Sequence, residues 1–324
     1  MRALLSSLAC ILTFTLYGIN AQFTHLTTSV GLAHNHVSCI LADRNGMMWF
    51  GTSNGVCRYD GYSMKVYTQS KSDFNGLPDN FISALFQSAD GDIWIGSDKG
   101  AACYSPLFDK VTSVRGVKGK AVTSFAQNSS GVLFCVADGK LYRLNTENRF
   151  VPVIRNVSRE HVATGRVIAV DNKDQLWFGL HNKLSSLDSN FCVHNQIPVD
   201  DTSEGSAKSR VLDIYVDKDN NIWAGTNGGG IICFNQSTMT VSRYNNSDGL
   251  VNNVVRAVSQ DARGRIWCGT ERGISIMQPD GRFDTIRQDL SNRFALNDNA
   301  IYDIIPDAYD NMWVGTYFGG VNIF

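Results

Sequence analysis

The chain has 324 residues and carries 29 Lys and Arg against 30 Asp and Glu, so its formal net charge is −1 at pH 7. This balance, and the lack of a basic run, argue against a nucleic-acid-binding protein that works by neutralising phosphates. Gly, aromatic and β-branched residues are prominent and helix-favouring residues are not, which favours an all-β protein with a substantial core.

The first 21 residues have the pattern of a secretory signal peptide. Arg2 supplies the positive charge, residues 3–17 are mostly apolar, and Ala21 stands at the expected cleavage point before Gln22. An uncleaved membrane anchor is the alternative. Residues 22–324 contain no second long apolar run, so we expect an exported, periplasmic domain that makes no membrane contact itself.

The tryptophans mark an internal repeat. Each opens a motif of the form W-x-G-T or W-x-G-S, or a loose copy of it, at Trp49, Trp94, Trp177, Trp223, Trp267 and Trp313. Their spacings are 45, 83, 46, 44 and 46 residues, and Phe134 fills the hidden position inside the gap of 83. Seven copies of a unit of about 43 residues predict a solenoid, a propeller or an array.

Each copy has the pattern of four short strands. In the second copy, strand-like runs at 81–86, 93–96, 101–104 and 110–114 are separated by turns rich in Gly, Asp and Ser. Four such strands form an antiparallel meander, and seven meanders predict a seven-bladed β-propeller. The Trp or Phe of each copy is then a core residue between blades, contributing about 2–3 kcal/mol on burial, rather than a stacking platform for a ligand.

The two ends of the chain predict how the ring closes. The last copy has three strands only, at 301–305, 312–315 and 321–324, and residues 22–27 stand just before the first strand of copy one. Pairing of this leading segment with the last copy completes blade seven and removes the open edges. Residues 22–324 are therefore expected to form one domain.

A short polar residue precedes each Trp or Phe by six positions: Asp43, Ser88, Asn128, Asp171, Asp217, Asp261 and Asp307. Such side chains suit a turn, where they accept backbone N–H groups. The run 217–221 also resembles a calcium loop, but Ile222 replaces the required glycine. Residues 228–230 lack the lysine and helix of a phosphate loop. We expect neither a metal nor a cofactor.

The cysteines are expected to be buried thiols. Seven remain after signal-peptide removal, and an odd number excludes a complete set of intramolecular disulfides. Most lie in apolar strand patterns, where a free cysteine packs as a small hydrophobic residue. One or two disulfides are the alternative.

The repeat resembles that of the two-component regulator propeller family. The family pattern of a strand, D-x-x-G-x-I/M-W-x-G-T, N-G and an R-Y-D ending is matched by residues 43–60, and 219–230 and 261–273 match nearly as well. Residues 76–80 and 249–253 are similar to its G-L-x-x-N lead-in. Repeats three and four depart from it, with Phe134 for Trp and Leu180 for Thr.

This resemblance implies the periplasmic sensor of a Bacteroidetes hybrid two-component system. Such sensors carry two propellers, a β-sandwich, a membrane helix, a histidine kinase and a response regulator, and they recognise oligosaccharides. It therefore implies an oligosaccharide ligand, kinase modules downstream, a phosphorelay and scope for a homodimer through those modules. The chain shows no kinase or DNA-binding motif, so we expect an excised or truncated first propeller or a stand-alone relative, without enzymatic activity.

Two sets of residues are candidates for ligand contact, because the strand order places them on one face. The turns between strands two and three vary from copy to copy, and contribute Asn54, Lys99, His181, Asn227, Arg272, Tyr317 and Phe318. The first strands surround the axis, and they or the residues before them contribute Arg166, Arg210, Arg256 and Tyr302. Aromatic rings could stack on a sugar, and the arginines could hold a uronate or sulfate. Salt bridges from the arginines to Asp213 or Asp303, and ordinary solvated turns, are the alternatives.

Two other functions remain open. A streptogramin-lyase-like enzyme, a propeller with a similar repeat, would need a general base such as His181, His34 or His36 with an acidic partner or metal, and no recurring acid is evident. A protein-interaction platform, comparable to WD-repeat propellers, is the second.

Overall fold

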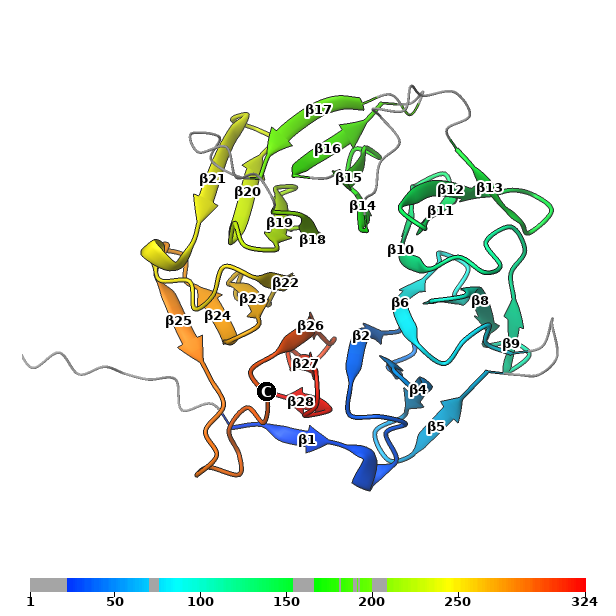
Figure 1. Ribbon diagram of the computed structural model, residues 1–324, viewed down its shortest axis with the longest axis horizontal. Helices are drawn as coiled ribbons and strands as arrows, with labels where there is room; N and C mark the ends of the chain where they lie inside the picture. The colour runs from blue at the N-terminus through cyan, green and yellow to red at the C-terminus, as the bar shows by residue number, and fades with distance from the viewer. Residues whose placement is uncertain are drawn as a thin grey trace, which may run out of the picture.

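The computed structural model describes residues 22–69, 76–153, 166–180, 182–188, 191, 193–199 and 209–324. Within them the chain forms a ring of seven four-stranded antiparallel sheets around one axis (Figure 1). The predicted seven-bladed propeller is confirmed. The expected signal peptide, His181 and Cys192 lie outside the described residues.

The first four blades follow the predicted meander, each numbered from the axis outward. Blades one and two consist of β2 (Val37–Ala42), β3 (Met48–Thr52), β4 (Gly55–Tyr59), β5 (Met64–Tyr67), β6 (Ile82–Gln87), β7 (Ile93–Ser97), β8 (Gly100–Ser105) and β9 (Lys110–Ser113). Blades three and four consist of β10 (Val122–Gln127), β11 (Leu133–Ala137), β12 (Lys140–Leu144), β13 (Phe150–Pro152), β14 (Ile168–Val170), β15 (Leu176–Leu180), β16 (Lys183–Leu187) and β17 (Val193–Pro198).

The remaining blades continue this order. Blades five and six consist of β18 (Val211–Val216), β19 (Ile222–Thr226), β20 (Ile231–Asn235), β21 (Thr240–Tyr244), β22 (Val255–Gln260), β23 (Ile266–Thr270), β24 (Gly273–Met277) and β25 (Phe283–Ile286). Blade seven consists of β26 (Ile301–Pro306), β27 (Met312–Thr316), β28 (Val321–Ile323) and β1 (Thr24–Leu26). Two short 3₁₀ turns, η1 (Thr28–Val30) and η3 (Asn246–Asp248), lie in connections. No helix in these ranges could span a membrane.

The N-terminal strand closes the ring, as predicted. β1 pairs antiparallel with β28, with Thr24 opposite Ile323 and Leu26 opposite Val321 (Figure 1). Phe23, only 2% exposed, adds a ring contact with Phe324 at 5.5 Å between centroids. The outer edge of β28 is thereby covered by a strand from the opposite end of the chain.

The core consists of one apolar layer between each pair of neighbouring blades. Trp49 packs against Ile82, Ile93 and Ile95 of blade two, and the other tryptophans and Phe134 take the same place in their own layers. A glycine two residues after the Trp allows this approach, because a Cβ atom at Gly51 would lie 2.8 Å from Ile82. The predicted role of the tryptophans as inter-blade packing is confirmed.

The polar residue six positions before the Trp is also its hydrogen-bond acceptor. In blade one, the indole Nε1 of Trp49 donates to Asp43 Oδ2 at 2.9 Å, and Asp43 Oδ1 accepts the N–H groups of Asn45 and Met47. The same indole bond, at 2.8 to 3.1 Å, forms in five further blades at Trp94, Trp177, Trp223, Trp267 and Trp313. The predicted turn role is confirmed, and it includes a buried side-chain bond.

Blade three replaces both partners of this bond. Phe134 has no N–H to donate, and its counterpart is the uncharged Asn128, whose Oδ1 accepts the backbone N–H of Val132 at 2.8 Å. The exchange therefore leaves no carboxylate without its indole donor.

Buried carboxylates join two pairs of adjacent inner strands. Asp303 Oδ2 accepts the backbone N–H of Ile40 in blade one at 2.6 Å, and Asp213 Oδ2 accepts that of Val258 in blade six at 2.7 Å. Burial raises the pKa of Asp303 to about 7 and that of Asp213 to about 6, although these N–H bonds favour the charged form.

The six described cysteines after the signal segment are free thiols, and five of them are buried. Burial raises the pKa of Cys57 to about 11 and that of Cys268 to about 12, which keeps both protonated at neutral pH. For these positions the expectation of unpaired, packed cysteines is confirmed.

Candidate functional site

One repeated backbone bond builds the face that carries the candidate residues, which we call the upper face. In each blade whose loops are described, the backbone N–H of the residue four positions after the Trp or Phe donates to the backbone carbonyl of the residue thirteen positions before that Trp or Phe. The bonds measure 2.8 to 3.3 Å and join Ser53 to His36, Asp98 to Phe81, Asp138 to Ala121, Asn227 to Arg210, Glu271 to Val254 and Tyr317 to Ala300. Each turn between strands two and three is thereby fixed beside the start of its own inner strand.

One residue of each of these inner strands lies at a β-bulge. The residue eleven before the Trp or Phe falls where the register with the second strand shifts, at Ser38, Ser83, Thr123, Leu212, Arg256 and Tyr302. A bulge frees one residue from the ladder and re-aims its side chain.

Four predicted residues meet in an aromatic cluster over blades six, seven and one. The rings of Tyr302 and Tyr317 stack at 5.6 Å with an interplanar angle of 16°, and Phe318 lies 4.2 Å from Tyr317. The guanidinium of Arg256 lies 4.8 Å from the centroid of Tyr302. Tyr317 and Phe318 are 41% and 64% exposed, so solvent reaches this apolar surface.

His36 is buried beneath the aromatic cluster. Its ring meets Tyr302 and Tyr317 edge-on at 5.0 and 5.1 Å, and its Nδ1 is hydrogen-bonded to Ser53 Oγ. Burial, with a smaller contribution from His34, lowers the pKa of His36, so the imidazole is neutral at pH 7. This histidine contacts both tyrosine rings and is only 5% exposed.

Arg256 is paired with Glu271, which precedes Arg272 in the turn between the second and third strands of blade six. Its Nη2 donates to Glu271 Oε1 at 2.5 Å, while its Nε is buried and has no hydrogen-bond partner among the described protein atoms. The alternative of a salt bridge from Arg256 to Asp213 or Asp303 is therefore wrong, because both carboxylates point between blades and accept backbone N–H groups.

The other predicted residues that the structure describes are exposed, and no hydrogen bond, ion pair or ring contact joins their side chains to the aromatic cluster. Asn54 and Arg272 occupy turn tips, where their backbone N–H groups donate to Thr52 and Thr270. Asn227 and Arg210 are neighbours through the repeated backbone bond. Arg166 lies near enough to Asp98 to lower the pKa of that carboxyl, although burial has the larger effect and raises it overall. Lys99 donates to Asp79 at 2.7 Å and lines a separate pocket.

The run 217–221, which resembles a calcium loop in sequence, forms a turn in which the Asp217 carboxylate accepts hydrogen bonds from the protein itself. The carboxylate of Asp217 accepts bonds from the backbone N–H groups of Asp219 and Asn221, the Asn221 amide and the Trp223 indole. Its oxygens are therefore engaged within the protein. Across the described ranges, no three His, Cys, Asp or Glu residues are grouped so that they could hold a metal ion.

Sequence reasoning missed Phe81, Glu271 and Ser53 as neighbours of the aromatic cluster. Phe81 contacts His36 at 5.7 Å and is 38% exposed. A signal existed: His36 and Phe81 each stand thirteen positions before their Trp, and Ser53 and Glu271 each stand four after it. A comparison of these two positions across the seven copies would have identified Phe81, Glu271 and Ser53.

The chain matches the model of the two-component regulator propeller family in five segments, residues 31–54, 76–99, 205–228, 249–272 and 295–318. A curated relative, histidine kinase P4 of Formosa agariphila, is 31% identical over 111 residues, which is 32% of this chain and 8% of that protein. The matched segments include the inner strand and the turn that build the upper face in blades one, two, five, six and seven.

Solved structures share the fold. Two extracellular domains of B. thetaiotaomicron proteins described as hybrid two-component systems align with TM-scores of 0.75 and 0.76 at 22% identity, over 94% of this chain and 39% and 41% of theirs. Virginiamycin B lyase from Staphylococcus aureus aligns with a TM-score of 0.72 at 11% identity, over 93% of this chain and 97% of the lyase. The chain thus spans about two fifths of the two extracellular domains.

Blades three and four, where the sequence motif departs, are the two that the family model leaves unmatched. The other five carry the motif, the indole bond and the repeated backbone bond of the upper face together. Five of the seven blades therefore carry the two-component regulator propeller repeat.

Proposed function

We propose that this chain is the periplasmic ligand-sensing propeller of a hybrid two-component regulator, and that it contributes to oligosaccharide recognition upstream of a histidine kinase. The match to the two-component regulator propeller model and the similarity to histidine kinase P4 support the kinase context. The chain spans only part of these relatives, so the kinase, a second propeller and a homodimer through those modules belong to the proposal.

The aromatic cluster is the observation that carries this proposal. It combines exposed ring surface at Tyr317 and Phe318 with a guanidinium at Arg256, whose buried Nε has no hydrogen-bond partner. Apolar rings can cover the C–H face of a sugar, and an adjacent arginine can donate to a hydroxyl or grip a carboxylate. His36, which is hydrogen-bonded to Ser53, contacts the rings of Tyr302 and Tyr317, so the surface is formed without a ligand.

The test is equilibrium dialysis of the domain against a panel of neutral and acidic oligosaccharides, followed by calorimetry with any that bind. We expect Tyr317→Ala and Arg256→Ala to weaken binding about tenfold, the loss typical of one good contact. Arg272→Ala should weaken binding of an acidic oligosaccharide as well. Tyr62, 98% exposed on the β4–β5 turn of the opposite face, provides the matched control Tyr62→Ala, which should bind as the wild type does.

Other outcomes decide between the remaining functions. An altered product in the dialysate would support a lyase and contradict a sensor without catalysis. Absence of binding to every glycan would favour a protein partner. Unchanged affinity in both Tyr317→Ala and Arg256→Ala would remove the aromatic cluster as the site. The reading frame beyond Phe324 tests the kinase context independently.

A further inference from the structure

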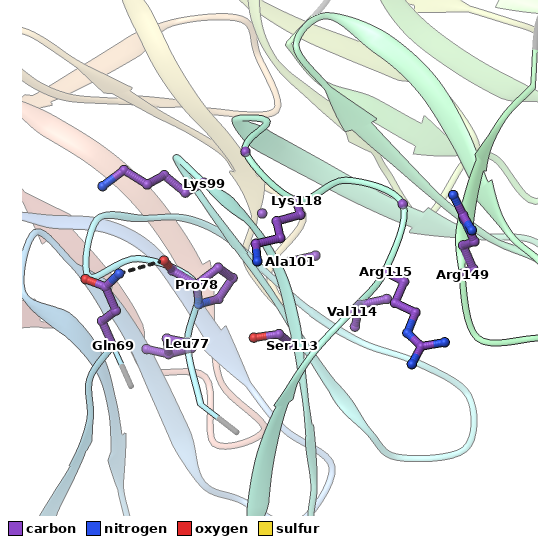
Figure 2. Close-up of a pocket in the computed structure, with 13 residues that line it drawn as sticks. Gln69, Leu77, Pro78, Lys99, Ala101, Ser113, Val114, Arg115, Lys118 and Arg149 are labelled. Atoms are coloured by element: carbon purple, nitrogen blue, oxygen red, sulfur yellow. Dashed lines mark hydrogen bonds between the residues drawn. The ribbon is translucent and has the colours of Figure 1, made fainter. Parts of the chain in front are cut away.

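A second candidate site lies between blades three and four, on the face opposite the upper face. It is a pocket of about 460 Å³, a volume within the range of small-ligand pockets. Its apolar lining includes Phe134, Val170, Leu176, Leu187 and Phe191. The pocket drawn in Figure 2 is a different one, which lies on the upper face between blades two and three.

The pocket lies where two facing side chains are smaller than in most of the ring. In four other layers, the Trp of one blade contacts an aromatic ring on the third strand of the next blade, or directly after that strand. These pairs, at 4.8 to 6.4 Å between centroids, are Trp49 with Tyr104, Trp177 with Phe234, Trp267 with Phe324 and Trp313 with Tyr59. Between blades three and four, Phe134 faces Leu187 instead, and both line the pocket. This layer therefore has less side-chain volume in the place that an indole and a second ring fill elsewhere.

Asn128 contributes a hydrogen-bond donor to the pocket lining. Its Oδ1 accepts the Val132 N–H at 2.8 Å and the Ser130 hydroxyl at 2.9 Å, just as Asp43 Oδ1 accepts the turn N–H groups in blade one. Its Nδ2 therefore takes the position in which Asp43 Oδ2 accepts the indole of Trp49. Among the described residues this Nδ2 has no acceptor, so its N–H groups can donate to a ligand.

The rest of the lining favours a neutral, flat ligand. Charged side chains of both signs, Lys173, Asp174 and Asp188, line the pocket, so it has no excess of positive charge to attract an anion. The rings of Phe134 and Phe191 lie 5.8 Å apart at an angle of 62°. Phe191 adopts a φ of 60°, which bulky side chains seldom do. A planar molecule can pack on such rings in the offset or edge-to-face arrangement that aromatic pairs prefer.

We propose that this pocket binds a neutral, planar heteroaromatic molecule that carries a hydrogen-bond acceptor on its ring edge. The molecule would lie between Phe134 and Leu187 and accept a hydrogen bond from Asn128 Nδ2. It would thereby join blades three and four, whose shared layer contains no Trp from blade three. This site lies on the opposite face from the aromatic cluster and does not depend on the proposed function.

The experiment is an NMR titration of the domain, carrying isotope-labelled asparagine, with three uncharged probes. Benzimidazole has the bicyclic ring and an edge acceptor, indole has the ring without the acceptor, and cyclohexanone has an acceptor without an aromatic ring. We expect benzimidazole to bind about fivefold more tightly than indole, as one neutral hydrogen bond predicts, and cyclohexanone to bind more weakly than either. Benzimidazole should also shift the side-chain amide resonance of Asn128 and raise the melting temperature, because it binds the folded protein.

Three variants locate the bound probe. Leu187→Tyr copies Tyr104 at the equivalent position of blade two, so it should fill the pocket and weaken benzimidazole binding about tenfold or more. Leu144→Tyr is the matched control, because it makes the same change at the equivalent position of blade three, at a residue that does not line the pocket. It should leave affinity within about twofold of the wild type. Asn128→Asp should remove the preference for benzimidazole over indole, because a carboxylate accepts the N–H that both probes carry.

The proposal is overturned if benzimidazole does not bind, if indole or cyclohexanone binds as tightly, or if Leu144→Tyr weakens binding as much as Leu187→Tyr does. Binding that is lost in Tyr317→Ala but unaffected by Leu187→Tyr would also overturn it and place the probe at the aromatic cluster. Near-ultraviolet circular dichroism checks that Leu187→Tyr is folded. If it is not, the preference in Asn128→Asp decides: its loss supports the site, and its persistence overturns it.

Discussion

Replacing the buried Trp–Asp pair of blade one by the Phe–Asn pair that blade three carries should lower the free energy of unfolding by less than the sum of the two single substitutions. Trp49 is fully buried, and its indole bond to Asp43 measures 2.9 Å. Trp49→Phe removes a donor from a carboxylate and some packing volume, which costs about 2–4 kcal/mol. Asp43→Asn alone turns an amide N–H toward the indole N–H, or gives up a turn bond, and costs about 1–3 kcal/mol.

The double variant removes both problems. Without the indole N–H, the asparagine can direct its oxygen to the N–H groups of Asn45 and Met47, as Asn128 does toward Val132. We therefore expect Asp43→Asn to cost less than about 0.5 kcal/mol when Trp49 is already Phe, a coupling typical of residues in direct contact.

Urea unfolding followed by near-ultraviolet circular dichroism would measure the four species of this cycle. The converse substitution, Asn128→Asp beside Phe134, should destabilise blade three, because it places a carboxylate where no indole can donate. Additive effects of the two blade-one substitutions, within about 0.5 kcal/mol, would refute this account of the pair.

Two further predictions concern the ring. Deletion of residues 22–28 should lower the free energy of unfolding by roughly 3–6 kcal/mol, because Phe23 and Leu26 lose their burial and β28 its partner; an unchanged melting temperature and radius of gyration would contradict closure by β1. The contribution of Asp213 and Asp303 to stability should fall as pH rises from the ordinary aspartate pKa of 3.8 to about 7, because in the folded state both keep protons that the unfolded chain has released. Asp303→Ser, which copies Ser124 at the equivalent position of blade three, should flatten this dependence in thermal melts, and an unaltered slope would count against it.

Most of the fold could be predicted because the repeat is carried by core residues. The Trp spacing and turn residues indicated seven blades, and the missing fourth strand of the last copy indicated closure by residues 22–27. The indole bond was missed although both partners stand at a fixed spacing, and the joint change to Asn128 and Phe134 is its signature in the sequence.

The candidate site was only partly predictable, because it depends on the directions in which individual side chains point, and the repeat pattern does not determine these. Tyr302, Tyr317 and Phe318 were found because aromatic residues stood at variable positions of a constant frame. The sequence suggested Asp213 or Asp303 as the partner of Arg256. Both aspartates stand ten residues before their Trp, whereas Arg256 stands eleven before Trp267, and their carboxylates point between blades, so neither pairs with Arg256.

The pairing of β1 with β28 joins segments separated by nearly the whole chain, so it also sets an order of assembly. During synthesis β1 is made before the other strands of the ring and β28 after them, and for that interval Phe23 lacks the residues of blades six and seven against which it packs. Such distant pairing is slow to form. The early blades must therefore persist as an open arc with a bare strand edge, which makes chaperone protection of the unfinished ring an expected requirement in the cell.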